Sequence, residues 1–127
     1  MIFDTDIVVW VLRGHTGAIA LVESVPLPGR KVSAVSYLEV LYGCLDKTQL
    51  QRFIEHISTK YSEVLPLSEK TTAAAVHIMK TFALSRRPDV ADVLIAATAL
   101  DCGEVVATAN VKHFDFIPGL VVKPFRP

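Results

Sequence analysis

The chain is poor in cysteine and has no long apolar run. Its two cysteines, Cys44 and Cys102, form no close-spaced metal or redox motif. Both lie in apolar helical sequence, so we expect buried free thiols. No run of apolar residues reaches the roughly 20 that a membrane-crossing helix needs. The N-terminus lacks a basic region followed by a cleavable apolar stretch. These absences favour a soluble, cytoplasmic protein that does not associate with a membrane.

An excess of charge of either sign is also missing. Thirteen basic side chains balance 13 acidic ones, which argues against strong non-specific binding to nucleic acid but leaves room for a local basic patch. Neither a Walker loop nor a G-x-G-x-x-G motif is present, so nucleotide binding of those kinds has no support. No Ser/His/Asp or Cys/His set points to covalent acyl chemistry. Zinc is not favoured, because no ligand spacing links the four histidines, His15, His56, His77 and His113.

What the chain does have is apolar sequence in alternating segments. Hydrophobic residues make up 51% of the 127 positions, which predicts one domain over residues 1–127 with a single core. We expect strands at 1–3, 31–34, 64–67, 104–107 and 120–123. We expect helices at 6–12, 16–24, 36–45, 46–61, 68–82 and from 89 or 92 to 102, with a loop at 26–29. This alternation predicts an α/β fold, with a mainly parallel sheet of four to five strands flanked by helices on both faces.

The segment 88–103 is the most informative of these. Pro88 cannot continue a preceding helix, and Asp89 or Asp92 suits the start of the next one. Gly103 suits a left-handed C-terminal cap. Between these ends the helix is apolar on nearly every face, so it should be deeply packed. A carboxylate at the start of such a helix is held rigidly, as a metal or catalytic site requires.

Four polar residues, far apart in the chain, are expected to meet. Asp4 ends the first strand, Glu39 lies on the helix after the second, Asp92 opens the helix before the fourth, and Asn110 follows the fourth. Ligands of parallel sheets sit beyond the carboxyl ends of the strands, where the strand order reverses. The simpler alternatives are that Asp4, Thr5 or Asp6 only caps a helix and that Glu39 is a solvated surface residue. Apolar neighbours leave little room for a wide polar face around Glu39.

Carboxylates gathered in one crevice repel one another, and a divalent cation removes that repulsion. Mg²⁺ prefers hard oxygen ligands and is held by one or two direct carboxylates with several waters. Mn²⁺ accepts similar ligands. A metal held in this way lowers the pKa of bound water and stabilises charge on a phosphoryl oxygen. Hydrolysis of a phosphodiester is therefore the natural reaction class.

Four blocks of sequence carry a family resemblance. FDTDI, SAVSYLEVLYG, DVLIAATAL and TANVKHF, in this order, resemble PIN-domain proteins, and specifically VapC-type toxin ribonucleases of toxin–antitoxin systems. The resemblance implies a Mg²⁺- or Mn²⁺-dependent endoribonuclease that leaves a 5′-phosphate and a 3′-hydroxyl. It assigns Asp4, Glu39 and Asp92 as the catalytic acids and metal ligands, directly or through water.

The fourth acidic position of the wider family falls on Asn110. Its neutral oxygen weakens the case for a second metal, and Asp6 and Asp89 are candidates for the missing charge. Thr108 and Ser36 match polar positions that orient the acids through hydrogen bonds. The acid that the family sometimes has before the closing Phe is His113 here, and we do not count it among the site residues.

The resemblance also implies partners. They are an RNA substrate, a second copy of the chain in a homodimer, and a small antitoxin whose tail inserts into the active-site groove and often presents an arginine there. Arg86, Arg87 and Lys112 flank the site and could contact RNA phosphates. Their alternative is plain solvated loop charge.

Two other functional hypotheses follow from the residues. Asn110 and the weak net charge motivate a catalytically silent PIN fold that acts as a binding module. Asp4 and Asp6 after a first strand suggest a phospho-receiver domain. That hypothesis fails at the third strand, where EVLPLSE offers no aspartate to accept a phosphate.

Overall fold

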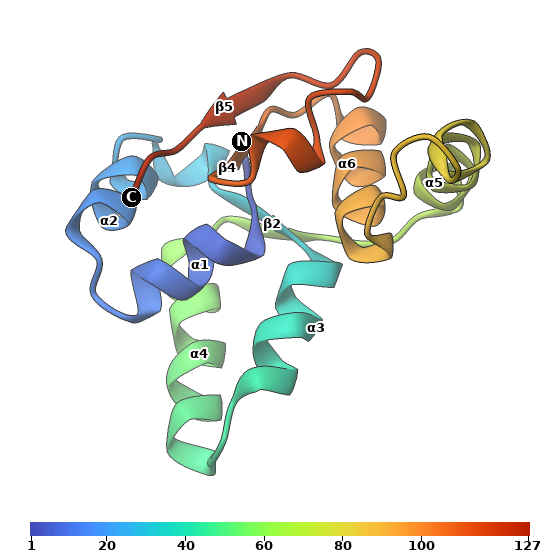
Figure 1. The fold of residues 1–127 in the computed structure, drawn as a ribbon. Coiled ribbons are helices and arrows are strands. Elements are labelled where there is room, and N and C mark those ends of the chain that lie inside the picture. Colours follow the sequence, from blue (N-terminus) through green and yellow to red (C-terminus); the bar gives the residue numbers. More distant parts are fainter.

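The computed structural model describes residues 1–127 and contains one parallel sheet of five strands in the order β3-β2-β1-β4-β5 (Figure 1). The strands are β1 (Ile2–Phe3), β2 (Lys31–Ser33), β3 (Glu63–Leu65), β4 (Val106–Thr108) and β5 (Val122–Pro124). Every neighbouring pair is parallel. The predicted α/β fold with helices on both faces is confirmed, and the sheet is wholly parallel.

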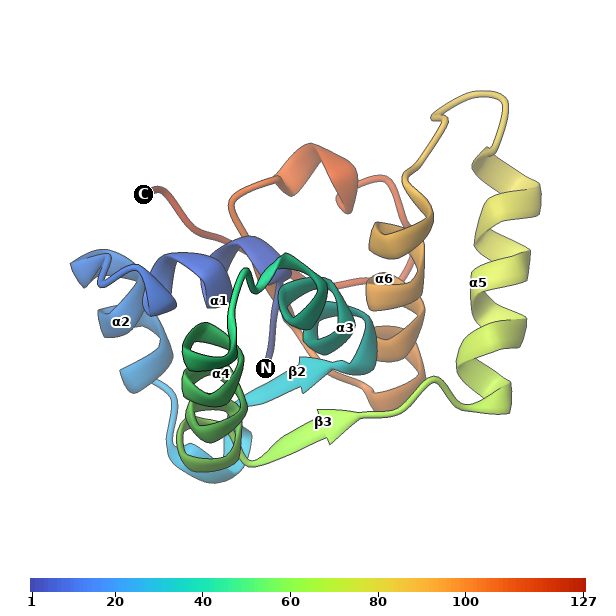
Figure 2. The ribbon, with the colours of Figure 1, turned by 90° about the horizontal axis from the view of Figure 1, so that it is seen from below.

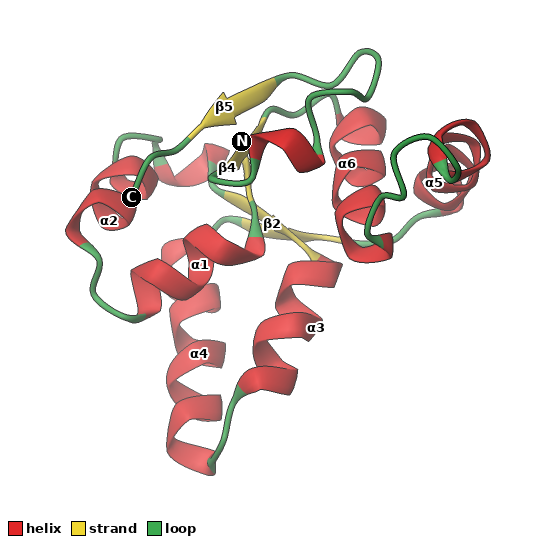
Figure 3. Cartoon of the chain, in the orientation of Figure 1, coloured by secondary structure: helices red, strands yellow, loops and turns green.

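Six α-helices and two 3-10 turns connect the strands (Figure 3). The α-helices are α1 (Thr5–Leu12), α2 (Thr16–Glu23), α3 (Ala34–Gly43), α4 (Lys47–Lys60), α5 (Glu69–Phe82) and α6 (Val90–Cys102). The short turns are η1 (Leu27–Gly29) and η2 (Val111–His113), and η1 lies where the sequence predicted only a loop.

The predicted boundaries need three corrections. Helix α3 begins at Ala34 and not at Ser36, because the Ser33 hydroxyl accepts a hydrogen bond from the backbone N–H of Ser36 and caps the helix. Strand β4 begins at Val106, two residues later than predicted. Glu104 lies before the strand, and its carboxylate accepts a hydrogen bond from the N-terminal ammonium group. The last strand begins at Val122, also two residues late.

Side chains alternate between two cores on the two faces of the sheet. Ile2 and Val106 pack with α5 and α6, whereas Phe3 and Ala107 pack with α1, α2 and α4. Successive side chains of a strand point to opposite faces of the sheet. Because both faces are covered by a core, both residues of β1 and the first two of β4 are apolar. Each face is covered because the connections from β1 to β2, from β2 to β3 and from β3 to β4 all pass through α-helices.

The helices differ in how far they stand from the sheet. In two views, α6 lies beside the sheet and α5 packs outside it (Figures 1 and 2). Helices α3 and α4 extend away from the sheet together and join at their far end (Figure 1). Residues of α1, α3 and α4 line a groove, which is described with the site below.

The ends of α6 follow the sequence prediction. Asp89 is the N-cap and accepts hydrogen bonds from the backbone N–H groups of Ala91 and Asp92. Gly103 is the C-cap, with a left-handed φ of 65°. These caps fix where the helix starts, and so place Asp92 in its first turn.

Both cysteines are free, as predicted, but the expected burial is wrong for one of them. Cys44 is half-buried and Cys102 is exposed. Cys102 is the last residue of α6, on the turn that leads out to Gly103.

No single helix is long and apolar enough to cross a bilayer. Only α1 and α2 taken together have the length and apolar composition of a membrane span. They are bent by 115° relative to each other, and both contribute side chains to a core.

Candidate active site

The site lies where the strand order reverses. The chain proceeds from β1 outward to β2 and β3, then returns to place β4 against the other side of β1. The loops after β1 and β4 therefore separate from one another and leave a crevice at the carboxyl edge of the sheet. Asp4 follows β1 directly, and Thr108 ends β4.

Asp4 is the buried centre of this crevice. Its side chain caps α1 by accepting a 2.7 Å hydrogen bond from Thr5 N, and it accepts another of 2.7 Å from Thr108 Oγ1. The pKa of Asp4 is raised from 3.8 to about 7. Burial is the largest cause, and the negative charges of Asp6 and Asp92 add to it, while the hydrogen bonds from Thr108 and Thr5 act in the opposite direction. The capping and site hypotheses for Asp4 are therefore compatible, because one carboxylate does both.

Asp6 lies in the first turn of α1 and faces the loop after β4. Its Oδ2 accepts hydrogen bonds from Ala109 N at 3.2 Å and from Asn110 Nδ2 at 3.3 Å. Burial raises the pKa of Asp6 above its ordinary value. The side-chain amide of Asn110 is thus hydrogen-bonded to Asp6. Asn110 stands at the family's fourth acidic position, and Asp6 supplies a carboxylate beside it.

Glu39 stands at the rim of the crevice. The Thr5 hydroxyl donates to Glu39 Oε1 at 2.8 Å and lies 2.8 Å from Ser36 Oγ. Glu39 is exposed, so the expectation that its apolar neighbours leave little polar face is wrong. Val40 is buried in the core, but Leu38 is itself 60% exposed, so this side of α3 is open to solvent. Glu39 keeps access to solvent while the Thr5 hydroxyl of α1 holds it.

Asp92 approaches from α6. Its Oδ2 lies 2.9 Å from His113 Nδ1, the only ion pair within the acidic group. Burial raises the pKa of Asp92, and the charges of Asp89 and Glu39 add to that rise. Asp89 itself is exposed and serves as the cap of α6.

The mutual effects on pKa show that the predicted acids gather. Asp4 senses the charge of Asp92, and Asp92 senses that of Glu39. No Lys or Arg forms an ion pair with any of them, so a hard divalent cation fits the donor set by charge and by oxygen chemistry. In this side-chain arrangement no three acidic, His or Cys groups lie close enough to hold one ion. A cation would therefore bind one or two carboxylates directly and reach the others through water.

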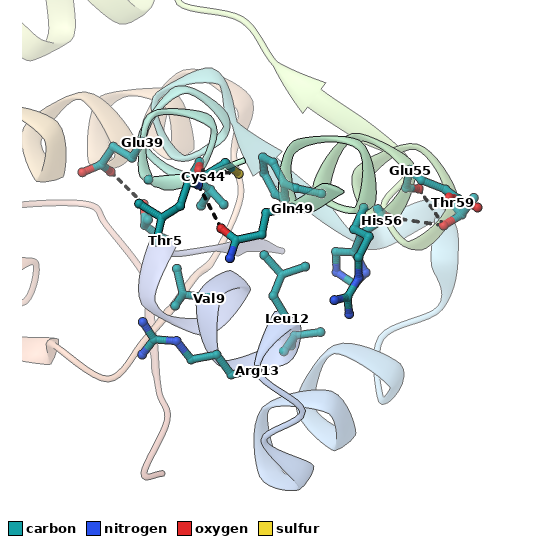
Figure 4. A pocket seen from close by; sticks show the side chains of 16 residues that line it. Thr5, Val9, Leu12, Arg13, Glu39, Cys44, Gln49, Glu55, His56 and Thr59 are labelled. Atoms are coloured by element: carbon teal, nitrogen blue, oxygen red, sulfur yellow. Dashed lines mark hydrogen bonds between the residues drawn. The ribbon is translucent and has the colours of Figure 1, made fainter. Parts of the chain in front are cut away.

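A groove leads away from the acids between α1 and the α3–α4 pair (Figure 4). It has a volume of about 730 Å³. Thr5 and Glu39, which are hydrogen-bonded to each other, lie at one end of it, and Glu55, His56 and Thr59 lie toward the other (Figure 4). Its wall is apolar with basic and polar groups between, among them Val9, Leu12, Arg13, Val40, Arg52 and Phe53.

Comparison with known proteins identifies the fold. A model of the PIN domain family matches residues 1–117. The chain belongs to the PIN domain family. No curated protein sequence matches it, but solved structures do, over nearly their whole length.

Three of these structures are informative for this PIN domain. A toxin–antitoxin complex from Klebsiella pneumoniae is 27% identical with a TM-score of 0.81, and the match covers 99% of this chain and 98% of that one. VapBC-1 from nontypeable Haemophilus influenzae is 28% identical with a TM-score of 0.79, covering 98% of each chain. VapBC2 from Rickettsia felis, bound to a promoter DNA fragment, is 23% identical with a TM-score of 0.83, covering 99% and 100%, and shows the fold alone. The resemblance to VapC-type PIN toxins, a family of nucleases, is confirmed.

The three basic residues expected to flank the site differ in their surroundings. Arg86, Arg87 and Lys112 are all exposed. The Arg86 guanidinium lies 5.3 Å from the centre of the Phe116 ring, a cation–π contact. Arg87 has a left-handed φ of 48° in the loop before α6. Lys112 lies in η2 beside His113, which contacts Asp92. It is the only one of the three basic residues adjacent in sequence to a residue that contacts a site acid.

Sequence reasoning missed two residues of the PIN-domain site. Thr5 was considered only as a helix cap, yet its hydroxyl joins α1 to Glu39 and Ser36 on α3. His113 was set aside because it is not an acid, yet it contacts Asp92. The sequence contained a pattern that pointed to each residue. Thr5 lies between Asp4 and Asp6, and His113 immediately precedes the buried Phe114 in the fourth matching block, TANVKHF.

Proposed function

We propose that this PIN-domain protein is a metal-dependent endoribonuclease, the toxin component of a toxin–antitoxin system. The observation that carries the proposal is a group of acids at the carboxyl edge of a parallel sheet with no Lys or Arg to neutralise them. The two solved relatives above 25% identity, one a toxin–antitoxin complex and the other VapBC-1, support the toxin assignment.

Asp4, Asp92 and Glu39 would hold Mg²⁺, or Mn²⁺ as a substitute, directly or through water. The bound cation supplies an activated water and neutralises charge on the phosphodiester. The chain's own contribution is placement. Thr108 and the backbone of Thr5 fix Asp4 from two sides, and the Thr5 hydroxyl fixes Glu39. Asp6 and Asn110 close the β4 side of the crevice.

The raised pKa of Asp4 explains why the cation matters. Without a positive charge, the buried Asp4 carboxyl takes up a proton near neutral pH and loses its value as a ligand. A divalent cation at the site would favour the ionised form of Asp4 and lower its pKa. The site therefore couples metal binding to the charge state that the chemistry needs.

The test is cleavage of RNA by the purified protein with Mg²⁺ or Mn²⁺. Asp4→Asn and Asp92→Asn should each abolish cleavage, because each keeps the size of the side chain and removes its charge. Asp101→Asn is the matched control, since Asp101 lies at the other end of α6 and accepts hydrogen bonds from Ser68 and Thr71. Undiminished cleavage by both site variants would end the assignment.

For the antitoxin, we propose that its tail lies along the groove between α1 and the α3–α4 pair. Glu39 lines one end of the groove, so an occupant that extends past it would obstruct access to the other acids. An arginine at its tip would pair with the carboxylates that lack a cationic partner. A peptide competing with RNA in wild-type protein, but not after Val9→Glu in the groove wall, would support this placement; equal competition in both would contradict it.

For the homodimer, we propose that α3 carries part of the interface. Leu38 is 60% and Tyr42 93% exposed, and the two lie one helical turn apart on the same side of α3. Sedimentation velocity should show a dimer that Tyr42→Glu dissociates. A wild-type monomer at micromolar concentration would contradict this arrangement.

A catalytically silent binding module is the second candidate. It is favoured by the absence of any three metal-binding groups close together and by Asn110, whose amide is occupied by Asp6. This function predicts tight binding of a protein partner with no metal-dependent cleavage. The RNA assay above separates the two functions directly.

A further inference from the structure

The acids of the site are held in place to different degrees. Asp4 and Asp6 each accept two or more hydrogen bonds, mostly from backbone N–H groups. The Asp92 carboxylate accepts only one, from His113 Nδ1 at 2.9 Å. The orientation of Asp92 therefore depends on a single side chain.

Asp92 needs such a partner because its neighbours repel it. Asp89 and Glu39 both disfavour its charged form. The side chain is 18% exposed, so it has a route toward solvent and away from the crevice. The donor that follows β4, His113 Nδ1, opposes this tendency.

His113 is well placed to do this even though its ring is exposed. It ends η2, which follows β4 directly, and its backbone N–H donates to Asn110 O at 2.9 Å. The next residue, Phe114, is fully buried and anchors the turn in the core. The backbone of His113 is thus fixed, and only the imidazole projects toward α6.

We propose that His113 is a positioning residue whose Nδ1–H holds the Asp92 carboxylate in the crevice, so that its second oxygen faces the cation and the RNA. This inference rests on the proposed function. A carboxylate can only accept a hydrogen bond, so Nδ1 carries the hydrogen and Nε2 of the neutral ring does not. The contact therefore specifies one tautomer as well as one orientation.

Three substitutions separate positioning from mere bulk. In His113→Asn the side-chain amide N–H lies near the position of Nδ1, in His113→Gln it lies near Nε2, and His113→Ala has no donor. Mn²⁺ affinity, measured by electron paramagnetic resonance without RNA, should weaken on the order of ten- to a hundredfold in the Ala and Gln variants. The Asn variant should restore most of it, and kcat for RNA should follow the same order while KM changes little.

His77→Ala is the matched control, since His77 is an exposed histidine on α5, outside the site. It should leave Mn²⁺ affinity and kcat unchanged. Melting temperatures of all the His113 variants should match the wild type, because the ring is 57% exposed and fills no core space. A large drop in melting temperature that Asn does not restore would show a structural role and overturn the proposal.

A nuclear magnetic resonance measurement tests the contact without any activity. The imidazole ¹⁵N signals of His113 should report the Nδ1–H tautomer in the wild type and lose that preference in Asp92→Ala. An Nε2–H tautomer in the wild type, or wild-type Mn²⁺ affinity in His113→Ala, would overturn the role of His113 alone. A wild-type chain that neither binds Mn²⁺ nor cuts RNA would instead overturn the proposed function.

Discussion

Asp4 shows how a single residue can be costly for folding while it holds a central place in the candidate site. Its carboxyl is 4% exposed, caps α1 and contacts Thr108. Two donors satisfy its oxygens, but they do not offset the loss of hydration, and its pKa rises to about 7. The fold therefore keeps at its centre a group that is unfavourable when charged and unaccompanied by a cation.

The first prediction concerns pH and metal-free stability. Folded Asp4 keeps its proton up to about pH 7, whereas in the unfolded chain it loses it near its ordinary value of 3.8. Between these values the folded state binds more protons, so the free energy of unfolding falls as pH rises. In EDTA, we expect Asp4 to cause a loss of roughly 1–3 kcal/mol between about pH 4 and about pH 7.

Urea unfolding across this pH range measures the effect. Asp4→Asn removes the titrating group and keeps a good N-cap, so its stability should vary less with pH than that of the wild type. Asp101→Asn should follow the wild-type profile. Parallel profiles for the wild type and Asp4→Asn would show that Asp4 has an ordinary pKa.

The second prediction concerns Thr108. Thr108→Val keeps the shape of a fully buried side chain but removes the donor to Asp4 Oδ2 and the acceptor for Asn110 N. We expect a loss of about 1–3 kcal/mol, because the buried Asp4 carboxylate and the Asn110 N–H each lose a partner, together with reduced cleavage. Thr98→Val is the control: Thr98 is equally buried, but it only donates to Leu94 O within its own helix, so the loss should be smaller. Equal losses in urea unfolding would refute the special role of Thr108.

At the scale of elements, α6 is the helix whose ends matter most. Its body is buried on nearly every side, so it cannot shift without disturbing the core. Asp89 fixes its start and Gly103 its end. Because Asp92 lies in its first turn, the caps of α6 determine where that acid enters the crevice.

The third prediction tests the C-cap. Gly103 has a φ of 65°, and an added Cβ would meet nothing within 4 Å, so Gly103→Ala should cost about 1 kcal/mol through backbone strain alone. Gly43, the last residue of α3, also has open space around a Cβ but no positive φ. Gly43→Ala should therefore be neutral or stabilise by up to about 1 kcal/mol. Urea midpoints that shift in the same direction for both variants would contradict this account.

At the scale of the whole molecule, the site depends on strand order. The strand sequence β3-β2-β1-β4-β5 brings residues near position 4 beside residues near position 108. Helix α3 supplies Glu39 from one side, and α6 supplies Asp92 from another. The acids therefore meet only in the complete fold, which predicts that a bound cation stabilises the entire domain.

The fourth prediction follows from this coupling. Under the proposed function, Mn²⁺ should bind the folded site and not the unfolded chain, so a hundredfold excess over its dissociation constant should stabilise the protein by ~2.7 kcal/mol. Thermal melting with Mn²⁺ and with EDTA measures the difference, and Asp4→Asn should show much less of it. A wild-type melting temperature that millimolar Mn²⁺ leaves unchanged would argue against a preformed site.

The sequence by itself determined the alternation of strands and helices, the caps of α6, and the positions of Asp4, Glu39 and Asp92, because periodicity, capping and family motifs are local patterns. It misjudged the exposure of Glu39 and Cys102, and it left out His113 and Thr5. Only the tertiary structure decided these points. A side chain's hydration and its hydrogen-bond partners depend on segments that are distant in the chain. Thr5 lies 34 positions from Glu39 and His113 lies 21 from Asp92, and no local pattern records which distant group a carboxylate will face.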